Sequence, residues 1–203
     1  MKVIAPYFEI LEDLDNQSLD IRIEVCGRIC YKSEDKISAE SAKPFIRSII
    51  KHGHNSVTEM AVLTLRVLYD SESIAGLLFN LIPKFLHIDK VEEGKLLITG
   101  SVRAFRELYQ VNPTVKIVKA IAEYLGNRHP LFYEDLLPEG GLVKQKEVQV
   151  EKVPLEAVDA LPDDLLAKHR HVAVLFVVNR AITHEIVRHR PVSYLQESQR
   201  YCR

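Results

Sequence analysis

The sequence predicts an α+β protein in which helices pack on a mixed or antiparallel sheet. Helical spacing of apolar residues recurs in several segments, residues 61–67 alternate between apolar and polar side chains, and the helices and strands follow no regular alternation. The chain of 203 residues is long enough for a hydrophobic core and for one or at most two domains. Because no clean linker interrupts it, we expect one domain over 1–203.

Composition limits the classes of partner. With 27 Lys and Arg against 28 Asp and Glu, the net charge of −1 argues against a nucleic-acid or membrane-surface protein. No run approaches the roughly 18 apolar residues of a membrane helix, and the first residues lack the apolar region of a signal peptide. We therefore expect a cytoplasmic protein without a membrane partner. The three cysteines are too few for a disulfide scaffold.

The first clear helix is expected over 18–31, with Ser18 as its N-cap. Apolar residues recur at helical spacing through this segment and place Cys26 and Cys30 on one face. Two cysteines four apart can ligate a metal, but no further His or Cys lies at the spacing of a zinc finger. We therefore assign both thiols to the core and expect no metal.

The remaining elements follow from periodicity and from Gly and Pro positions. In the first half we expect a helix over 38–52 capped by Gly53, a turn over 52–59, a half-buried strand over 61–67 and a helix over 71–86 limited by Pro83. The middle is expected to hold an apolar stretch from 96, a helix carrying Arg103 and Arg106, a helix from Pro113 to Gly126, and a turn at 138–141. The last third predicts an exposed strand over 147–153, a linker over 154–164, a buried strand over 171–178, and a helix over 179–190 that Pro191 ends.

The last predicted helix carries the most informative chemistry. Arg180, His184 and Arg188 follow at spacings of four and lie along one side of it. This stripe is either a solvated face paired with carboxylates or a site for an anion. The second reading is favoured because hydroxyl and amide residues follow 188–190, and because arginine suits phosphate and carbonyl-rich heterocycles. The expected ligand is a phosphorylated small molecule rich in hydrogen-bonding groups.

This region resembles the signature of the flavin-dependent thymidylate synthases. In that family Arg-His-Arg is followed by seven residues and a serine, as Arg188-His189-Arg190 is here by Ser198, and Arg200-Tyr201 completes the pattern. Residues 23–59 resemble the family's first helices, with Cys30-Tyr31-Lys32-Ser33 and the turn Gly-His-x-Ser/Thr-x-x-Glu at 53–59. The two blocks cover roughly half the chain.

The resemblance implies that the protein converts dUMP to dTMP, using FAD as cofactor, methylenetetrahydrofolate as carbon donor and NADPH as reductant. It also implies an α+β homotetramer with the flavin sites between subunits. The residues implied in flavin binding are His54, Ser56, Glu59, Arg188, His189 and Arg190. Those implied to face dUMP are Glu185, Arg188, Gln196, Ser198 and Arg200, of which Ser198 and Arg200 are expected to be catalytic.

The chemistry of the residues is compatible with this reaction. Methylation at C5 of a uracil requires electron density there, and no cysteine lies in a convincing nucleophile setting. A reduced flavin supplies hydride instead, and the arginines supply position and positive potential. We expect Ser198 to act as a hydrogen-bond donor rather than as a nucleophile, and His189 to contact flavin rather than to act as a general acid.

Two features depart from the family pattern. Glu185 stands where Gln is common, and a carboxylate repels a phosphate unless it is neutralised or paired with an arginine. About 100 residues also separate the strand at 61–67 from that at 171–178, which typical members join almost directly. This block order is atypical, with an internal segment at about 70–170 inside the expected domain.

The internal segment itself resembles parts that normally follow the signature. Residues 99–108 resemble a Thr-Gly-Asn-x-Arg-Ala-x-Arg helix, with Ser101 in place of Asn, and 130–136 resemble the usual end of the chain. Either the protein is permuted and Arg103 binds flavin, or the segment is a duplicate, or its arginines are surface charges. We expect the natural protein to continue beyond Arg203.

Two other functions remain open at this stage. The first is a non-catalytic relative that binds flavin or nucleotide only, which the departures at Glu185 and Ser101 favour. The second is a nucleic-acid-binding module that uses the basic runs 168–171 and 188–190. The neutral net charge and the lack of interleaved exposed aromatic residues argue against the second.

Overall fold

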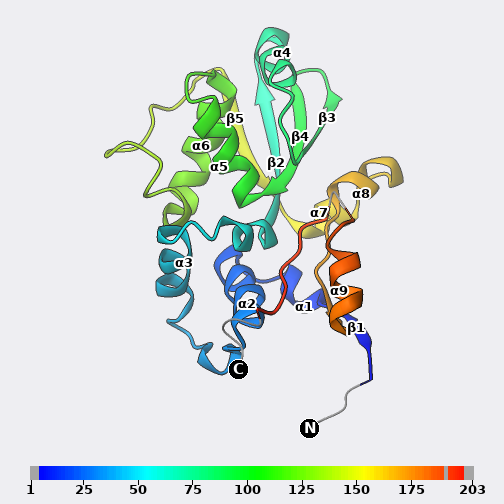
Figure 1. Cartoon of the computed structure of the whole chain (residues 1–203). Helices are drawn as coiled ribbons and strands as arrows, with labels where there is room; N and C mark the ends of the chain where they lie inside the picture. Colours follow the sequence, from blue (N-terminus) through cyan, green and yellow to red (C-terminus); the bar gives the residue numbers. More distant parts are fainter. Residues whose placement is uncertain (1–4, 190–191, 199–203) are drawn as a thin grey trace. The chain divides into compact units, whose positions relative to one another are not determined.

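The computed structural model describes residues 5–189 and 192–198 and divides the chain into two compact units (Figure 1). Unit 1 consists of Met1–Met60 together with His171–Arg203, and unit 2 is the intervening Ala61–Arg170. All described strands pair antiparallel, and helices pack on the larger sheet. The prediction of an α+β fold is confirmed.

Helices α2 and α3 form the centre of unit 1, where α2 packs on α3 and on the short helix η2. Ile23 of α2 and Ile46 of α3 are fully buried there. Cys26 and Cys30 are buried as predicted. The helices of this unit are α1 (Glu12–Asp15), α2 (Leu19–Tyr31), η1 (Glu34–Lys36), α3 (Ala42–Lys51), η2 (Asn55–Met60) and α9 (Arg180–Ile186).

The two ends of α3 follow from local chemistry. The helix begins at Ala42 rather than at residue 38, because Ser38 and Ser41 form a turn in which the Ser41 hydroxyl binds both backbone groups of Ser38. Gly53 has a φ of +71°, so it forms the predicted left-handed cap. The chain then turns directly into η2, which occupies the predicted turn over 52–59.

Unit 1 also contains a two-stranded antiparallel sheet that the sequence did not indicate. Strand β1 (Tyr7–Ile10) pairs with β6 (Val174–Val177), in the register Phe8 opposite Phe176. The prediction of a buried strand over 171–178 is wrong, because β6 is shorter and half-exposed. An apolar β-branched run marks a strand but does not show that its faces are covered.

Unit 2 is built on a four-stranded antiparallel sheet in the order β3-β4-β2-β5. The central pair joins β2 (Val62–Tyr69) to β4 (Lys95–Ser101), with β3 (Leu86–Glu92) and β5 (Val148–Val153) on the edges. Helices α4, α5 and α6 accompany this sheet, and Figure 1 shows α5 and α6 side by side. The helices are α4 (Glu72–Asn80), α5 (Val102–Val111), α6 (Lys116–Arg128), η3 (Pro130–Phe132), α7 (Leu155–Asp159) and α8 (Asp163–His169).

Both faces of this sheet are covered. Leu63, Leu65 and Val67 share one buried face of β2, as the alternation predicted. On the opposite face Leu97 and Val153 form a core with Val158 of α7. The prediction of a linker over 154–164 is therefore wrong: α7 and α8 are too short to show a helical period, yet they cover this second face.

Three predicted helices have different limits. The helix over 71–86 ends at Asn80, because Ile82, which precedes Pro83, and Phe85 both adopt positive φ, and residue 86 begins β3. The helix placed at Pro113 begins at Lys116, after an extended Val115. The helix over 179–190 is confirmed only as α9, which ends at Ile186, and Pro191 lies outside the described residues.

A chain of hydrogen bonds crosses the buried second face of the sheet. The hydroxyls of Thr64 and Thr99 lie 2.7 Å apart, and the Thr99 hydroxyl lies 2.7 Å from His169 Nδ1. Nε2 of His169 lies 3.1 Å from the carboxylate of Asp89, which Lys168 also contacts. This series of hydrogen bonds links β2, at the start of unit 2, to the end of α8, at the end of unit 2.

His169 and Asp89, the two ionisable groups at the end of this series of hydrogen bonds, respond to burial differently. Burial lowers the pKa of His169, although the hydrogen bond that the ring donates to Asp89 opposes that shift. For Asp89, burial opposes ionisation, but hydrogen bonds from Lys168 and His169 together hold the pKa of this carboxyl below its usual value. His169 is therefore neutral, and Asp89 charged, at neutral pH.

This arrangement predicts a pH-dependent stability. Because folding lowers the pKa of His169 below an unfolded value of about 6.5, the contribution of the neutral ring is complete above about pH 6.5 and is lost as the pH falls toward the folded pKa. Urea unfolding between about pH 8 and pH 5 should show a steeper loss in the wild type than in His169→Gln. Equal slopes in the two proteins would contradict a neutral, buried His169.

A buried arginine joins α5 to the segment after α6. Arg106 is 6% exposed and binds both carboxylate oxygens of Asp135, at 2.8 and 2.7 Å, as well as the carbonyl of Phe132. This bidentate pair holds the pKa of Asp135 below its usual value, mainly through the hydrogen bonds from Arg106. Arg106 is therefore a structural residue of unit 2.

Removing one partner of this pair should be costly. Asp135→Ala leaves the buried guanidinium without its counter-ion, and we expect a loss of about 2–4 kcal/mol in the free energy of unfolding. The matched control is Glu147→Ala, which removes the carboxylate of the exposed Lys116–Glu147 pair and should cost less than about 1 kcal/mol. Similar losses from the two variants, measured by urea denaturation, would show that burial of Arg106 does not matter.

Candidate functional site

The turn that follows α3 presents the first group of predicted site residues. His54 and Ser56 are exposed, and Glu59 is half-buried. Between them Val57 and Thr58 are buried, and the Thr58 hydroxyl donates to the carbonyl of Asn55 at 2.7 Å. The buried pair anchors η2, so the polar side chains of the turn face outward from a fixed backbone.

Close packing of α2 brings its last turn near this group. A Cβ on Gly27 would lie 2.8 Å from the ring of Phe45 and 2.9 Å from Val57, so only glycine lets α2 approach both α3 and η2 this closely. Arg28 reinforces the contact, because its guanidinium lies 4.4 Å from the Phe45 ring centre and pairs with the buried Glu24.

A hydrogen bond joins α2 to the turn directly. The hydroxyl of Tyr31 lies 2.9 Å from Nδ1 of His54. His52, whose ring centre is 6.2 Å from that of His54, instead directs its Nδ1 to the carbonyl of Ser48 at 2.7 Å. The two neighbouring imidazoles are thus held by different kinds of partner.

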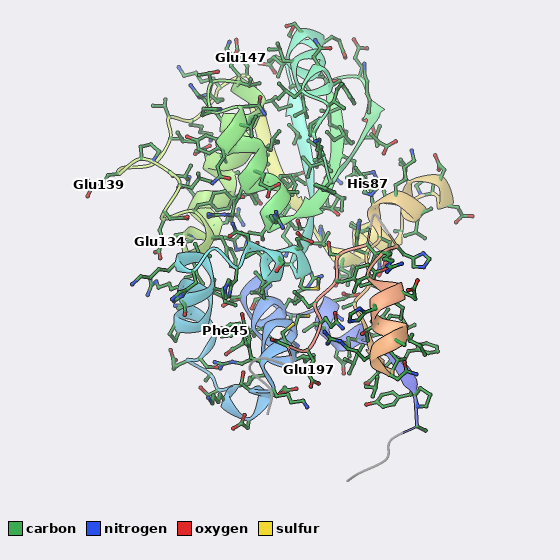
Figure 2. The ribbon with its side chains drawn as sticks, viewed as in Figure 1. Phe45, His87, Glu134, Glu139, Glu147 and Glu197 are labelled. Carbon is green, nitrogen blue, oxygen red and sulfur yellow. The ribbon has the colours of Figure 1, made fainter. Side chains whose placement is uncertain are left out.

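The C-terminal segment, residues 192–198, returns to the same end of α2 (Figure 1). The backbone N–H of Ser198 donates to the carbonyl of Cys30 at 3.0 Å, and Lys32 pairs with Glu197 at 2.7 Å. Figure 2 labels Glu197 and Phe45, the residues that flank this part of α2. The structure therefore brings together the two blocks that the resemblance singled out.

Helix α9 supports the C-terminal segment from its other side. Gln196 donates to the hydroxyl of Thr183 at 2.6 Å, and Arg180 donates to the carbonyl of Glu197 at 3.5 Å. Arg180 also donates to Nε2 of His184 at 2.9 Å, so these two members of the predicted stripe do lie together. The Asn179 side chain caps the helix by accepting from the N–H of Ile182.

The third member of the stripe, Arg188, lies beyond the end of α9 and pairs with Glu185 at 3.5 Å. Both side chains are about 70% exposed, at 72% and 70%. Within residues 5–189 and 192–198, neither Arg188 nor His189 forms a side-chain hydrogen bond with the turn at 54–59. The structure thus places both in unit 1 without joining them to His54.

The remaining predicted site residues fall elsewhere. Arg190 and Arg200 lie outside the described residues. Arg103 belongs to unit 2, where it pairs with Glu107 at 2.6 Å. Its neighbours have structural tasks there: Gly100 leaves room for Leu86, whose side chain would lie 2.2 Å from an added Cβ, and Ser101 caps α5 by accepting from Ala104 N–H.

The residues that position the site were mostly missed from sequence. Tyr31 and Lys32 stood inside the motif Cys30–Ser33, but nothing in their spacing indicated their partners. The sequence likewise gave no indication of the contacts that Thr183 and Glu197 make. Lys32 carries one local sign of its role, since it adopts a left-handed conformation with φ of 47° at the end of α2.

Among the described residues no group of three or more His, Cys, Asp or Glu could hold a metal ion. Burial raises the pKa of the Cys26 thiol to about 11, with Arg22 acting weakly in the opposite direction. A thiol with this pKa carries almost no thiolate at neutral pH. Cys26 is therefore a packing residue.

The basic run 168–171 does not form a free cationic surface. Lys168 pairs with Asp89 and Arg170 with Asp159, both at 2.6 Å, and the side chain of His169 is fully buried. These contacts disfavour the nucleic-acid alternative. None of the helices in the described part of the chain is long and apolar enough to cross a membrane.

Comparison with known proteins gives one family. The model of the thymidylate synthase complementing proteins matches residues 14–78 and 163–203, just over half of the chain. These are the segments that carry the 54–59 turn and the C-terminal segment. A search of curated proteins finds no match.

The burial of Cys26 predicts its reactivity. Because the thiol is 8% exposed and has a raised pKa, alkylation by iodoacetamide at about pH 8 should leave Cys26 unmodified in the folded protein and modify it in urea. Peptide mass spectrometry checks this residue separately from the other cysteines. Rapid modification of Cys26 in the folded protein would return it to consideration as a nucleophile.

Proposed function

Because the chain belongs to the family of thymidylate synthase complementing proteins, we propose that it catalyses the reductive methylation of dUMP to dTMP, with FAD as cofactor. Methylenetetrahydrofolate is the proposed carbon donor and NADPH the proposed reductant. The proposal includes a homotetramer, with Arg103 as a further flavin contact. Mass determination of the native protein in solution checks the oligomer.

One observation supports this function above the others. The turn at 53–59 and the C-terminal segment are more than a hundred residues apart in the chain, yet both contact the end of α2. Cys30 accepts from Ser198 while the next residue, Tyr31, binds His54. A contact of this kind is expected if both blocks serve one site.

The donor set suits a flavin nucleotide and a nucleoside monophosphate. His54 and Ser56 offer an imidazole and a hydroxyl on an exposed turn, and Arg188 and His189 offer cationic or neutral N–H donors. These groups match phosphate and carbonyl oxygens. When bound, the reduced flavin supplies hydride for the methylation, and the chain's own residues bind and orient.

In this proposal Ser198 and Gln196 face dUMP from the C-terminal segment. The backbone N–H of Ser198 donates to the carbonyl of Cys30, and the side-chain amide of Gln196 donates to the hydroxyl of Thr183, so both residues are held before substrate arrives. Arg200 is the proposed partner of the developing negative charge on the uracil carbonyl. No thiol is required, in agreement with the buried state of Cys26.

Glu185 is compatible with an anionic substrate, because Arg188 neutralises it. The same contact also supports the second candidate, a relative that binds flavin or nucleotide without catalysis. An Arg188 held by Glu185 is less available to a ligand than one next to the usual glutamine. The two candidates differ in turnover.

Titration with FAD tests the first step of the proposed reaction. We expect a saturable change in the flavin absorbance spectrum on addition of the protein. Release of tritium from dUMP labelled at C5, with NADPH and methylenetetrahydrofolate present, then separates the enzyme from the binder. Without any flavin binding the proposed enzyme fails, and only a relative that binds nucleotide alone remains.

Arg188→Ala tests the proposed flavin and dUMP contacts. Loss of a charge-assisted hydrogen bond to an anion should weaken FAD or dUMP affinity by about tenfold or more. The control is Arg128→Ala, which removes an exposed arginine of unit 2 that stacks on Tyr124. Unchanged affinity in Arg188→Ala would remove this arginine from the site, whereas equal losses in both variants would indicate a general effect of charge.

A further inference from the structure

The neighbouring histidines His52 and His54 allow their tautomers to be assigned from their partners. Nδ1 of His52 lies 2.7 Å from the carbonyl of Ser48, and because a carbonyl only accepts, this Nδ1 carries a proton. Nδ1 of His54 lies 2.9 Å from a hydroxyl that can donate, so its tautomer depends on the direction of that bond.

The chemistry of the two groups favours donation by Tyr31. A phenol hydroxyl has an ordinary pKa of about 10 and is a good donor, and the ring nitrogen of a neutral imidazole is a strong acceptor. The hydroxyl can also rotate to direct its hydrogen at Nδ1. In the opposite direction the imidazole would donate to a phenol oxygen, which is a weaker acceptor.

We propose that Tyr31 is a positioning residue that holds His54 as the tautomer with its proton on Nε2, so that Nε2–H is presented to an acceptor atom of the ligand. In the described part of the chain Nε2 of His54 has no hydrogen-bond partner, and the side chain is exposed. The imidazole therefore offers a donor of fixed direction to a phosphate or carbonyl oxygen. This role rests on the proposed function, in which His54 contacts flavin.

The fold fixes Tyr31 for this purpose. It is the last residue of α2, which is held against α3 and η2 by the close approach at Gly27. The residues on either side of Tyr31 hold the C-terminal segment, through the carbonyl of Cys30 and the side chain of Lys32. Orientation of His54 and placement of the C-terminal segment thus share one support.

The first test needs no ligand and no variant. A long-range 1H–15N correlation spectrum at about pH 8.5, well above the usual histidine pKa of about 6.5, distinguishes the two neutral tautomers of each ring. We expect a proton on Nε2 for His54 and on Nδ1 for His52. A proton on Nδ1 of His54 overturns the proposal, whether or not the protein binds flavin.

The second test removes the hydroxyl and keeps the ring. In Tyr31→Phe the tautomer preference of His54 should weaken while the spectrum of His52 stays the same, and FAD affinity should fall about fivefold, as expected for one hydrogen bond. Tyr7→Phe is the matched control, because it removes an exposed hydroxyl of the same unit. His54 signals or FAD affinity unchanged in Tyr31→Phe overturn the positioning role.

These measurements separate the two levels of inference. If the wild type shows the expected tautomers but binds no FAD, the proposed function fails and the assignment of Tyr31 as the residue that fixes His54 stands. If it binds FAD with the opposite His54 tautomer, the proposed function stands and the role of Tyr31 is lost.

Discussion

The carbonyl of Cys30 lies at the end of α2, where the last carbonyls of a helix have no partner within it. Two neighbouring carbonyls have local partners: the carbonyl of Ile29 accepts from the N–H of Lys32, and the carbonyl of Arg28 accepts from the N–H of Ser33. The carbonyl of Cys30 instead accepts from Ser198, a residue from the far end of the chain. Together with the Lys32–Glu197 ion pair, this hydrogen bond fixes the C-terminal segment on the end of α2, while the β1–β6 pairing joins the two segments of unit 1 elsewhere.

The end of α2 can serve in this way because the helix itself is immobilised. Gly27 allows it to lie against Phe45 and Val57, and Arg28, which pairs with Glu24, stacks on the same aromatic ring. The result is a site whose backbone is rigid and whose donors are exposed, which is the arrangement that favours binding of a charged ligand without a large ordering cost.

Unit 2 is the long stretch of chain between the two segments of unit 1, and it is stabilised by its own contacts. Its sheet is covered on both faces, and the hydrogen bonds from Thr64 through Thr99 to His169 connect its first strand to its last helix. The residues at 99–106 that resemble a family helix have structural partners inside this unit: Thr99 binds His169, Ser101 caps α5, and Arg106 binds Asp135. Unit 2 therefore has its own core and its own closed network of polar groups.

The sequence by itself determined the α+β class, the buried helix with Cys26 and Cys30, the cap at Gly53 and the alternation of β2, because each depends on neighbours within a few residues. It also identified the family through motifs at 53–59 and 188–198, which the family model matches. Only the tertiary structure decided that 154–164 covers a sheet, that Arg106 is buried, and that Tyr31 and Cys30 face His54 and Ser198. Those outcomes depend on contacts between residues far apart in the chain, and neither periodicity nor composition carries information about which distant segments meet.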